Sequence, residues 1–237
     1  MAHPPSRDSD LPFADFLRAC LANDPPKHVK CDFKEPEVVS PCLSLISSLV
    51  SSSPPNPNQS IPNQSIFLNA DVLPGPGKRG DPPTMPADAF VEACLSLSPP
   101  QPLSLGWSTN VARVYNPGGY YLPADAGAMR ALCEKHGLPG RAPVVFAANF
   151  RVAMRDPTAL KGLLGDLPGT QLLLWTGTGE PAVRGGEVEA ARDYFEREGL
   201  LERVGFDCLV AGGGVEAAVA ASKIVVINVI NWFRGLA

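Results

Sequence analysis

The sequence predicts an α/β fold, a TIM-type (β/α) barrel that is incomplete, with its first two strands missing. Short apolar segments with strand character alternate with segments of helical periodicity along most of the chain, as expected for a mainly parallel sheet. Six such strands follow His3, whereas a closed barrel of this type has eight. The chain has 237 residues, of which 45% are hydrophobic, so it can form the core of one domain.

The predicted elements follow one another in a regular order. Apolar residues recur at helical spacing in 13–21, where Phe13, Phe16 and Leu17 share one face. A continuous apolar run, as in 171–175, is typical of a buried strand. Helices are expected at 13–21, 41–50, 86–97, 125–136, 157–167 and 187–200. Strands are expected at 28–34, 65–73, 102–107, 142–150, 171–177 and 203–210.

Two segments lie outside this alternation. Residues 51–64 contain most of a tandem Pro-Asn-Gln-Ser-Ile repeat, and a short polar repeat with proline favours a flexible insert. The apolar stretch 215–233 is interrupted by Glu216 and Lys223, which favours a packed helix over a membrane span. We therefore expect a barrel domain over 1–210 and a divergent C-terminal helical segment over 211–237, with no transmembrane segment.

Composition excludes several classes of protein. The formal net charge is −4, which argues against nucleic acid as a main partner. The six cysteines form no Cys-x-x-Cys pair, which excludes zinc ribbons and thioredoxin-like motifs. Disulfides and scattered buried thiols both stay open, with the thiols favoured. Residues 1–19 lack the apolar core of a secretory signal.

Five motifs occur in the same order as in the menorin domain family, and the chain resembles that family. They are Met1 to Pro5 followed by Ser9-Asp10-Leu11, the Lys-x-Asp-Phe-Lys strand at 30–34, Phe67 to Pro76, Leu103 to Thr109, and Leu174 to Gly177. The similarity covers residues 1 to about 180 and fades after Arg203.

The resemblance implies a relative of the phospholipase-C-like phosphodiesterases. Such a site uses paired histidines and an acidic metal cluster. Family members carry a histidine strand and a Glu-x-Asp strand before the segment that contains His3, and neither is present in this chain. The resemblance also implies an extracellular location, whereas a chain complete as given, without a signal peptide, would be cytoplasmic.

The resemblance and the positions of polar residues at strand ends give a set of candidate site residues. His3 is the candidate catalytic acid or base; the alternative is a frayed terminal residue. Asp32 is the candidate ligand of Mg²⁺ or Ca²⁺, since these cations prefer carboxylate oxygens, with Lys30 and Lys34 as phosphate contacts. The alternative for these three residues is a locally compensated ion cluster at a strand end.

Further candidates for substrate binding come from the later strands. Asn69 and Asp71 alternate with an alanine and should point the same way, either into a site or into hydrogen bonds between core layers. Arg151 could clamp a phosphate or form a surface salt bridge, and Asn149 precedes it. Trp107 and Trp175 could wall a pocket or close the end of the barrel.

Two functions are therefore expected. The first is a phosphodiesterase-like protein that is inactive or incomplete, because one histidine and one aspartate supply only half of the expected site. The second is a non-catalytic recognition module at the cell surface. The expected partner is accordingly a phosphodiester or a protein ligand.

Overall fold

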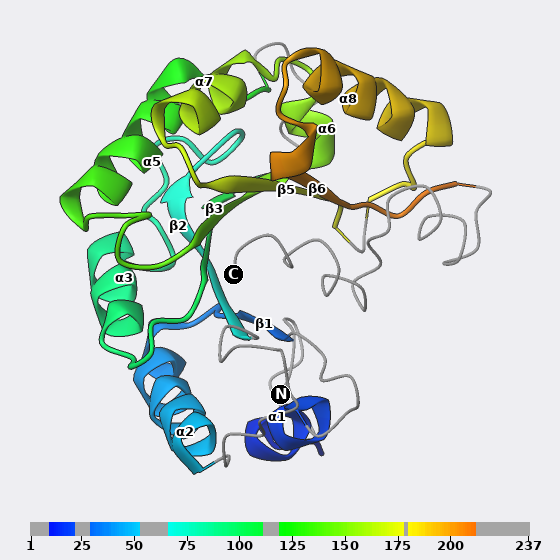
Figure 1. Cartoon of the computed structure of the whole chain (residues 1–237). Helices are drawn as coiled ribbons and strands as arrows, with labels where there is room; N and C mark the ends of the chain where they lie inside the picture. Colours follow the sequence, from blue (N-terminus) through cyan, green and yellow to red (C-terminus); the bar gives the residue numbers. More distant parts are fainter. Residues whose placement is uncertain (1–9, 22–28, 53–65, 111–118, 178–179, 212–237) are drawn as a thin grey trace.

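A computed structural model describes residues 10–21, 29–52, 66–110, 119–177 and 180–211. Their six strands form one parallel sheet in which each strand pairs with its neighbours in the sequence. The strands are β1 (Val29–Asp32), β2 (Ile66–Pro74), β3 (Leu103–Ser108), β4 (Val144–Asn149), β5 (Gln171–Trp175) and β6 (Val204–Asp207). Figure 1 shows that the sheet curls into a half-barrel. The predicted α/β class and the six strand positions are confirmed.

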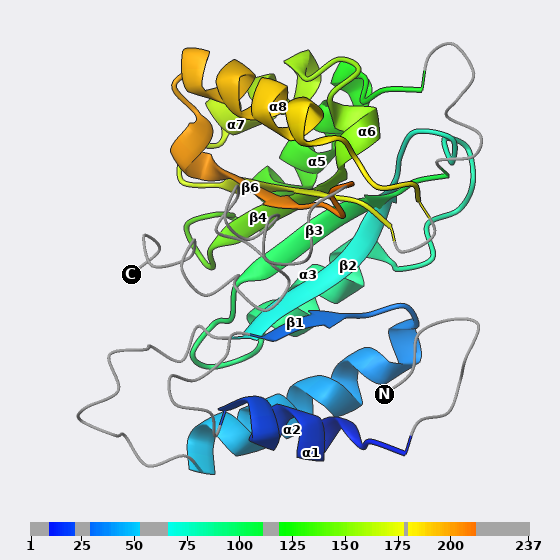
Figure 2. The same ribbon diagram turned by 90° about the vertical axis from the view of Figure 1, so that its right-hand side faces the viewer.

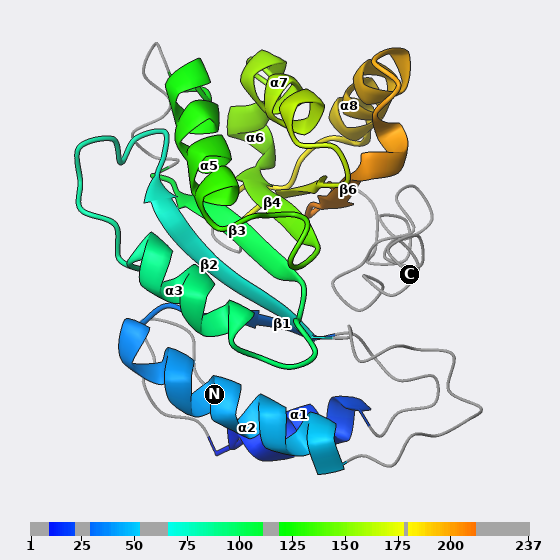
Figure 3. The ribbon, with the colours of Figure 1, turned by 60° about the vertical axis from the view of Figure 1, so that its left-hand side comes forward.

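The helices line the convex side of the sheet. Figures 1 and 3 show α2, α3, α5, α7 and α8 along this side. The helices are α1 (Phe13–Leu21), α2 (Val39–Ser52), α3 (Ala87–Leu95), α5 (Pro123–Lys135), α6 (Phe150–Ala153), α7 (Thr158–Asp166) and α8 (Gly185–Arg197), with 3-10 turns η1 (Pro36–Val38) and η2 (Leu201–Arg203). The sequence analysis missed only the four-residue α6 among these α-helices. Asn149 starts α6 by accepting a hydrogen bond from the backbone N–H of Val152 at 3.2 Å.

The main hydrophobic core lies between the convex face and the helices. Side chains alternate along each strand, and the register aligns Leu68 with Leu103 and Leu105 with Phe146. These four residues are fully buried in one core cluster, together with residues of α3, α5, α7 and α8. Burial of this apolar face accounts for most of the driving force for folding.

The concave face has a different composition. The same alternation directs Lys30, Asn69, Ser104, Asn149 and Asp207 to this side, which Figure 2 presents. It also carries the buried residues Phe67, Val145 and Leu173, which lie outside the main core cluster. The concave face therefore combines a partly apolar floor with polar groups, most of them toward the C-terminal ends of the strands.

Several sequence predictions fall outside the described residues. These are His3, the residues 53–64 of the predicted insert and the segment 212–237; α2 itself continues to Ser52, two residues into that insert. All six cysteines are free thiols. In the part of the chain that the structure describes, no helix is long and apolar enough to cross a membrane.

Candidate functional site

A polar cluster lies beside the C-terminal end of β1, on the middle of β2 and the first half of β3. Asp32 pairs in register with Asn69, and Asn69 pairs with Ser104 on the next strand. Two residues further along, Asp71 lies opposite Gly106. Residues in register on parallel strands point to the same face, so these side chains meet on the concave side. The structure thus brings together three residues predicted from sequence: Asp32, Asn69 and Asp71.

A chain of hydrogen bonds crosses these three strands. The Ser104 hydroxyl donates to Asn69 Oδ1 at 2.7 Å, and Asn69 Nδ2 donates to Asp32 Oδ1, also at 2.7 Å. Asn69 and Ser104 are buried, so their polar groups need these partners. The Asp32 carboxylate fixes the orientation of the Asn69 amide, because a carboxylate only accepts and so requires the NH2 group on its side. The amide N–H groups therefore face Asp32.

Lys34 connects the two carboxylates of the cluster. Its Nζ lies 2.9 Å from Asp32 Oδ2 and 3.8 Å from Asp71 Oδ2. Burial lowers the pKa of Lys34, but the two carboxylates outweigh this effect and raise it overall. Burial raises the pKa of Asp71, against the opposing effect of Lys34. The ammonium thus compensates two carboxylates that would otherwise repel each other.

Lys30 and Asp207 approach the cluster from opposite edges of the sheet. Lys30 lies on β1 and Asp207 on β6, yet the curl brings them close enough to interact electrostatically. Desolvation lowers the pKa of Lys30, against the attraction of Asp32, Asp207 and Asp71. Burial raises the pKa of Asp207. Counting Asp32, Lys34 and Asp71 as well, these five side chains carry three carboxylates and two ammonium groups, so they almost neutralise one another.

Gly106 makes room for Asp71. A Cβ at position 106 would lie 2.6 Å from Asp71 Oδ1 and 3.2 Å from the Ala147 backbone oxygen. Real Cβ atoms do not come this close to a carboxylate oxygen, so any side chain here would displace Asp71. The position requires glycine for steric reasons.

A second polar group lies at the ends of β4 and β5. Asn149 Nδ2 donates to Glu180 Oε1 at 2.7 Å, and the Gly177 backbone N–H donates to the same oxygen at 2.8 Å. Arg151 donates to the Pro181 backbone oxygen, and its Nε lies 3.7 Å from Glu180 Oε2. The structure therefore brings Asn149 and Arg151 together, around an internal carboxylate.

The two predicted tryptophans differ in their positions. Trp175 is partly exposed on the concave face and pairs in register with Asn149 and Asp207. Trp107 lies on the opposite, convex face, where it is fully buried and packs against Tyr121 and Phe146. Its indole N–H donates to the Asp125 backbone oxygen at 3.3 Å. Trp107 therefore contributes to the core and does not line the concave cluster.

The cluster fits an ion-paired lysine better than a divalent cation. Both Asp32 oxygens already accept from N–H donors, and one Asp71 oxygen faces Lys34. Among the described residues there is no group of three or more His, Cys, Asp or Glu side chains placed to hold a metal ion. Ca²⁺ takes six to eight oxygen ligands, and Mg²⁺ requires a near-octahedral set.

Sequence reasoning missed four residues of these two groups: Ser104, Gly106, Glu180 and Asp207. Ser104 and Gly106 break the apolar pattern of their strand at alternate positions, and this signal could have revealed them. Asp207 ends a strand in the same manner as Asp32. Glu180 follows a glycine turn whose Gly177 N–H it accepts from, but its side-chain partners Asn149 and Arg151 lie 31 and 29 residues earlier, so the group has no signal in the sequence.

The fold and its concave polar cluster define the chain as a βα-repeat half-barrel domain. The family model for the Menorin N-terminal domain matches residues 1–202, and the chain belongs to the menorin family. It is 27% identical over 200 residues to human (Homo sapiens) Protein FAM151B, a match that covers 84% of this chain and 65% of that protein. No solved structure gives a significant match.

Proposed function

We propose that this chain is a phosphodiesterase-like domain on a TIM-type barrel plan that binds a phosphodiester without hydrolysing it. The proposed site is the polar cluster formed by Asp32, Asn69, Asp71 and Ser104 on β1 to β3. Lys34 is its phosphate contact, and Lys30 lies beside it. The observation that carries the proposal is the position of Lys34 between Asp32 and Asp71.

The geometry favours binding over cleavage. Cleavage of a phosphodiester requires proton donors and acceptors on both sides of the phosphorus and, in this superfamily, a divalent cation. Here the ammonium of Lys34 occupies the space between the carboxylates where such a cation would be expected. Asn69 presents N–H groups to Asp32, and N–H groups repel a cation. Both Asp32 oxygens, which a metal ion would need as ligands, are therefore already engaged by N–H donors.

Lys34 retains capacity to bind a ligand. An ammonium group has three N–H donors; Asp32 Oδ2 lies within hydrogen-bond distance at 2.9 Å, whereas Asp71 Oδ2, at 3.8 Å, does not. The side chain is 36% exposed, so a remaining donor can reach a phosphate oxygen. A recognition module at the cell surface, the alternative function, is supported by the same observation, since it also binds without turnover.

The test uses bis-p-nitrophenyl phosphate as both substrate and ligand. With Mg²⁺ or Ca²⁺ present, we expect no release of p-nitrophenolate above buffer. Binding of the same compound, followed by NMR chemical shifts, should weaken about tenfold or more in Lys34→Ala. The reason is that one hydrogen bond to a charged group contributes about 1.5–3 kcal/mol. The matched control is Lys161→Ala, which removes a lysine paired with Glu198.

Two results would contradict the proposal. Turnover that disappears in Asp32→Ala or His3→Ala would show an active hydrolase. Equal binding by the wild-type protein and Lys34→Ala would place the ligand elsewhere.

A further inference from the structure

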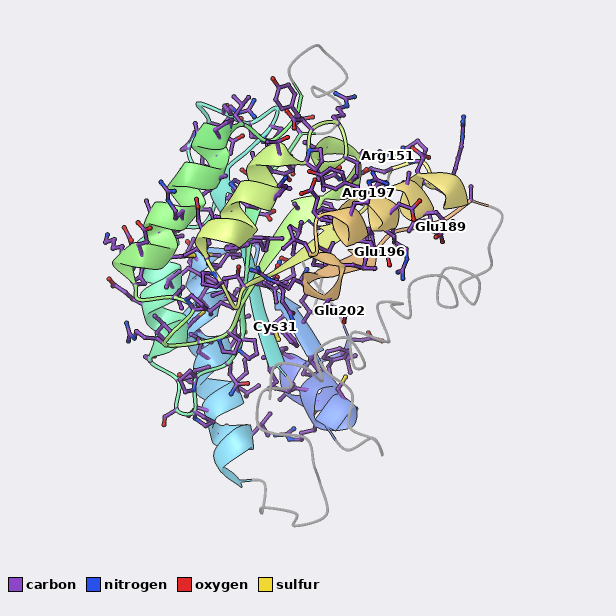
Figure 4. The ribbon with its side chains drawn as sticks, turned by 45° about the horizontal axis from the view of Figure 1, so that its top comes forward. Cys31, Arg151, Glu189, Glu196, Arg197 and Glu202 are labelled. Carbon is purple, nitrogen blue, oxygen red and sulfur yellow. The ribbon has the colours of Figure 1, made fainter. Side chains whose placement is uncertain are left out.

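The Glu180 carboxylate is held by donors from three parts of the chain. Asn149 ends β4, Arg151 lies on α6 and Gly177 follows β5. Figure 4 labels Arg151, and the views show α6 at the same end of the sheet as the loop after β5. The Glu180 side chain is 11% exposed and that of Arg151 is 21% exposed. We name Asn149, Arg151 and Gly177 the oxyanion cradle.

The carboxylate does not satisfy the cradle. Its Oε1 accepts from both Asn149 Nδ2 and the Gly177 N–H, whereas its Oε2 is buried without a hydrogen bond. Arg151 Nε is also buried without a hydrogen bond and lies 3.7 Å from that oxygen. An unsatisfied buried donor and acceptor both cost free energy. In this position the carboxylate therefore leaves one donor of the cradle, Arg151 Nε, without a hydrogen bond.

The shape of the cradle also depends on Gly177 having no side chain. A Cβ at Gly177 would lie 3.0 Å from Glu180 Oε1, so a glycine allows the oxygen to approach the backbone N–H closely. Asn149 is completely buried, and its Oδ1 accepts from the Val152 N–H, which directs Nδ2 toward the cradle. The Asn149 donor is thus fixed in place independently of Glu180.

We propose that the oxyanion cradle is a binding site for a phosphate group and that Glu180 occupies it as an internal competitor. A tetrahedral oxyanion has at least three acceptor oxygens, one for each of Asn149 Nδ2, the Gly177 N–H and Arg151 Nε. It would satisfy the donor that the planar carboxylate leaves unpaired. The ligand class is a phosphate monoester or inorganic phosphate, because a phosphodiester has only two non-bridging oxygens. The inference does not depend on the cluster around Lys34.

Thermal melts of the full chain with inorganic phosphate test the proposal, against chloride at matched ionic strength. In Glu180→Ala the cradle is vacant, so phosphate should raise Tm by about 3–6 °C at tenfold excess over its Kd. The wild-type protein should respond much less, because Glu180 competes. Glu180→Ala combined with Arg151→Ala should lose the response. Glu196→Ala, on the exposed face of α8 (Figure 4), is the matched control.

Glu180→Gln provides a second variant if Glu180→Ala does not fold. Glutamine keeps the shape of the side chain but removes the competing charge, so a phosphate-dependent rise in Tm above that of the wild-type protein is again expected. The proposal is overturned if the Glu180 variants respond no more than Glu196→Ala, or if the wild-type protein responds as strongly as they do. It is equally overturned if the double variant retains the response.

Discussion

Single residues on β3 determine how the polar cluster is arranged. Ser104 donates a hydrogen bond to the Asn69 amide oxygen, and Gly106 leaves the space that Asp71 fills. Neither residue carries charge, yet each constrains a side chain of the cluster. The positions of Asp32, Asn69 and Asp71 on one face followed from the two-residue period of a strand. Their connection through Ser104 and Lys34 did not follow, because it depends on the register between strands, which one sequence does not reveal.

Gly106→Ala should therefore destabilise the protein by about 1–3 kcal/mol, because the added methyl group would overlap Asp71 Oδ1. Urea unfolding measures this difference. Asp71→Ala should restore much of the loss when combined with Gly106→Ala, since it removes the overlapping atom. The matched control is Gly162→Ala in α7, where a Cβ would meet nothing within 4 Å. In that helix an alanine should stabilise by up to about 1 kcal/mol. Equal effects at the two glycines would contradict this account.

At the scale of elements, the sequence predicted the type and order of the helices and strands well, but the residues at which they begin and end less well. The helices were recognisable from their apolar period and the strands from their apolar runs, because both patterns reflect burial against the same core. The four-residue α6 escaped notice, since one turn has no periodicity. The core position of Trp107 was also missed, although Trp107 alternates with the buried residues Leu103 and Leu105 of its strand. A separate irregularity, the register shift between Asp71 and Leu73 of β2, cannot be recognised in a sequence.

Arg203 is the residue that joins three elements. It lies in η2 before β6 and donates to the backbone oxygens of Leu164, Leu167 and Thr170 at 2.8–3.0 Å. Leu164 lies in the last turn of α7, and Thr170 directly precedes β5. One guanidinium thus supplies charged donors to carbonyl groups at a helix end and before a strand, where the helix itself leaves carbonyls without a partner. Burial lowers the pKa of Arg203.

Arg203→Ala should lower the free energy of unfolding by about 2–4 kcal/mol, since it leaves several carbonyl groups without a charged donor. The measurement is chemical denaturation. Arg203→Lys should recover only part of the loss, because an ammonium group cannot reproduce the planar fork of donors. Arg197→Ala, at the exposed end of α8, serves as the control and should change stability by less than about 0.5 kcal/mol. A similar loss in the two alanine variants would contradict the role of Arg203.

For the whole molecule, the curl of the sheet separates two environments. The convex face carries the apolar core, and the concave face collects charges from strands that are far apart in the sequence. Lys30 and Asp207, from the first and last strands, interact across this face. The sequence predicted a curved parallel sheet but could not bring its two edge strands opposite each other. That placement depends on the degree of curl, which is a property of the complete fold.

The stability of the protein should accordingly depend on the ionisation of Asp207. Burial raises the pKa of Asp207 above its unfolded value, so its contribution is most favourable below about pH 3.9 and is lost as pH rises through the folded pKa. Asp207→Asn cannot ionise. The stability of this variant relative to the wild-type protein should therefore increase from acid toward neutral pH and then level off.

Urea unfolding of the two proteins between about pH 3.5 and 7.5 checks this expectation. Asp193→Asn, at an exposed position on α8, is the control and should show a flat difference. A difference that stays flat or falls with rising pH for Asp207→Asn would contradict the argument.

The strand order has a consequence for synthesis on the ribosome. Because every strand from β2 to β6 pairs with the one that precedes it, each new βα unit finds its docking surface already emerged. None of these six described strands has to wait for a partner encoded much later, and loop-closure entropy stays small at each step. The nascent chain can thus assemble in one direction, with β6 added last onto a sheet that already contains its neighbour.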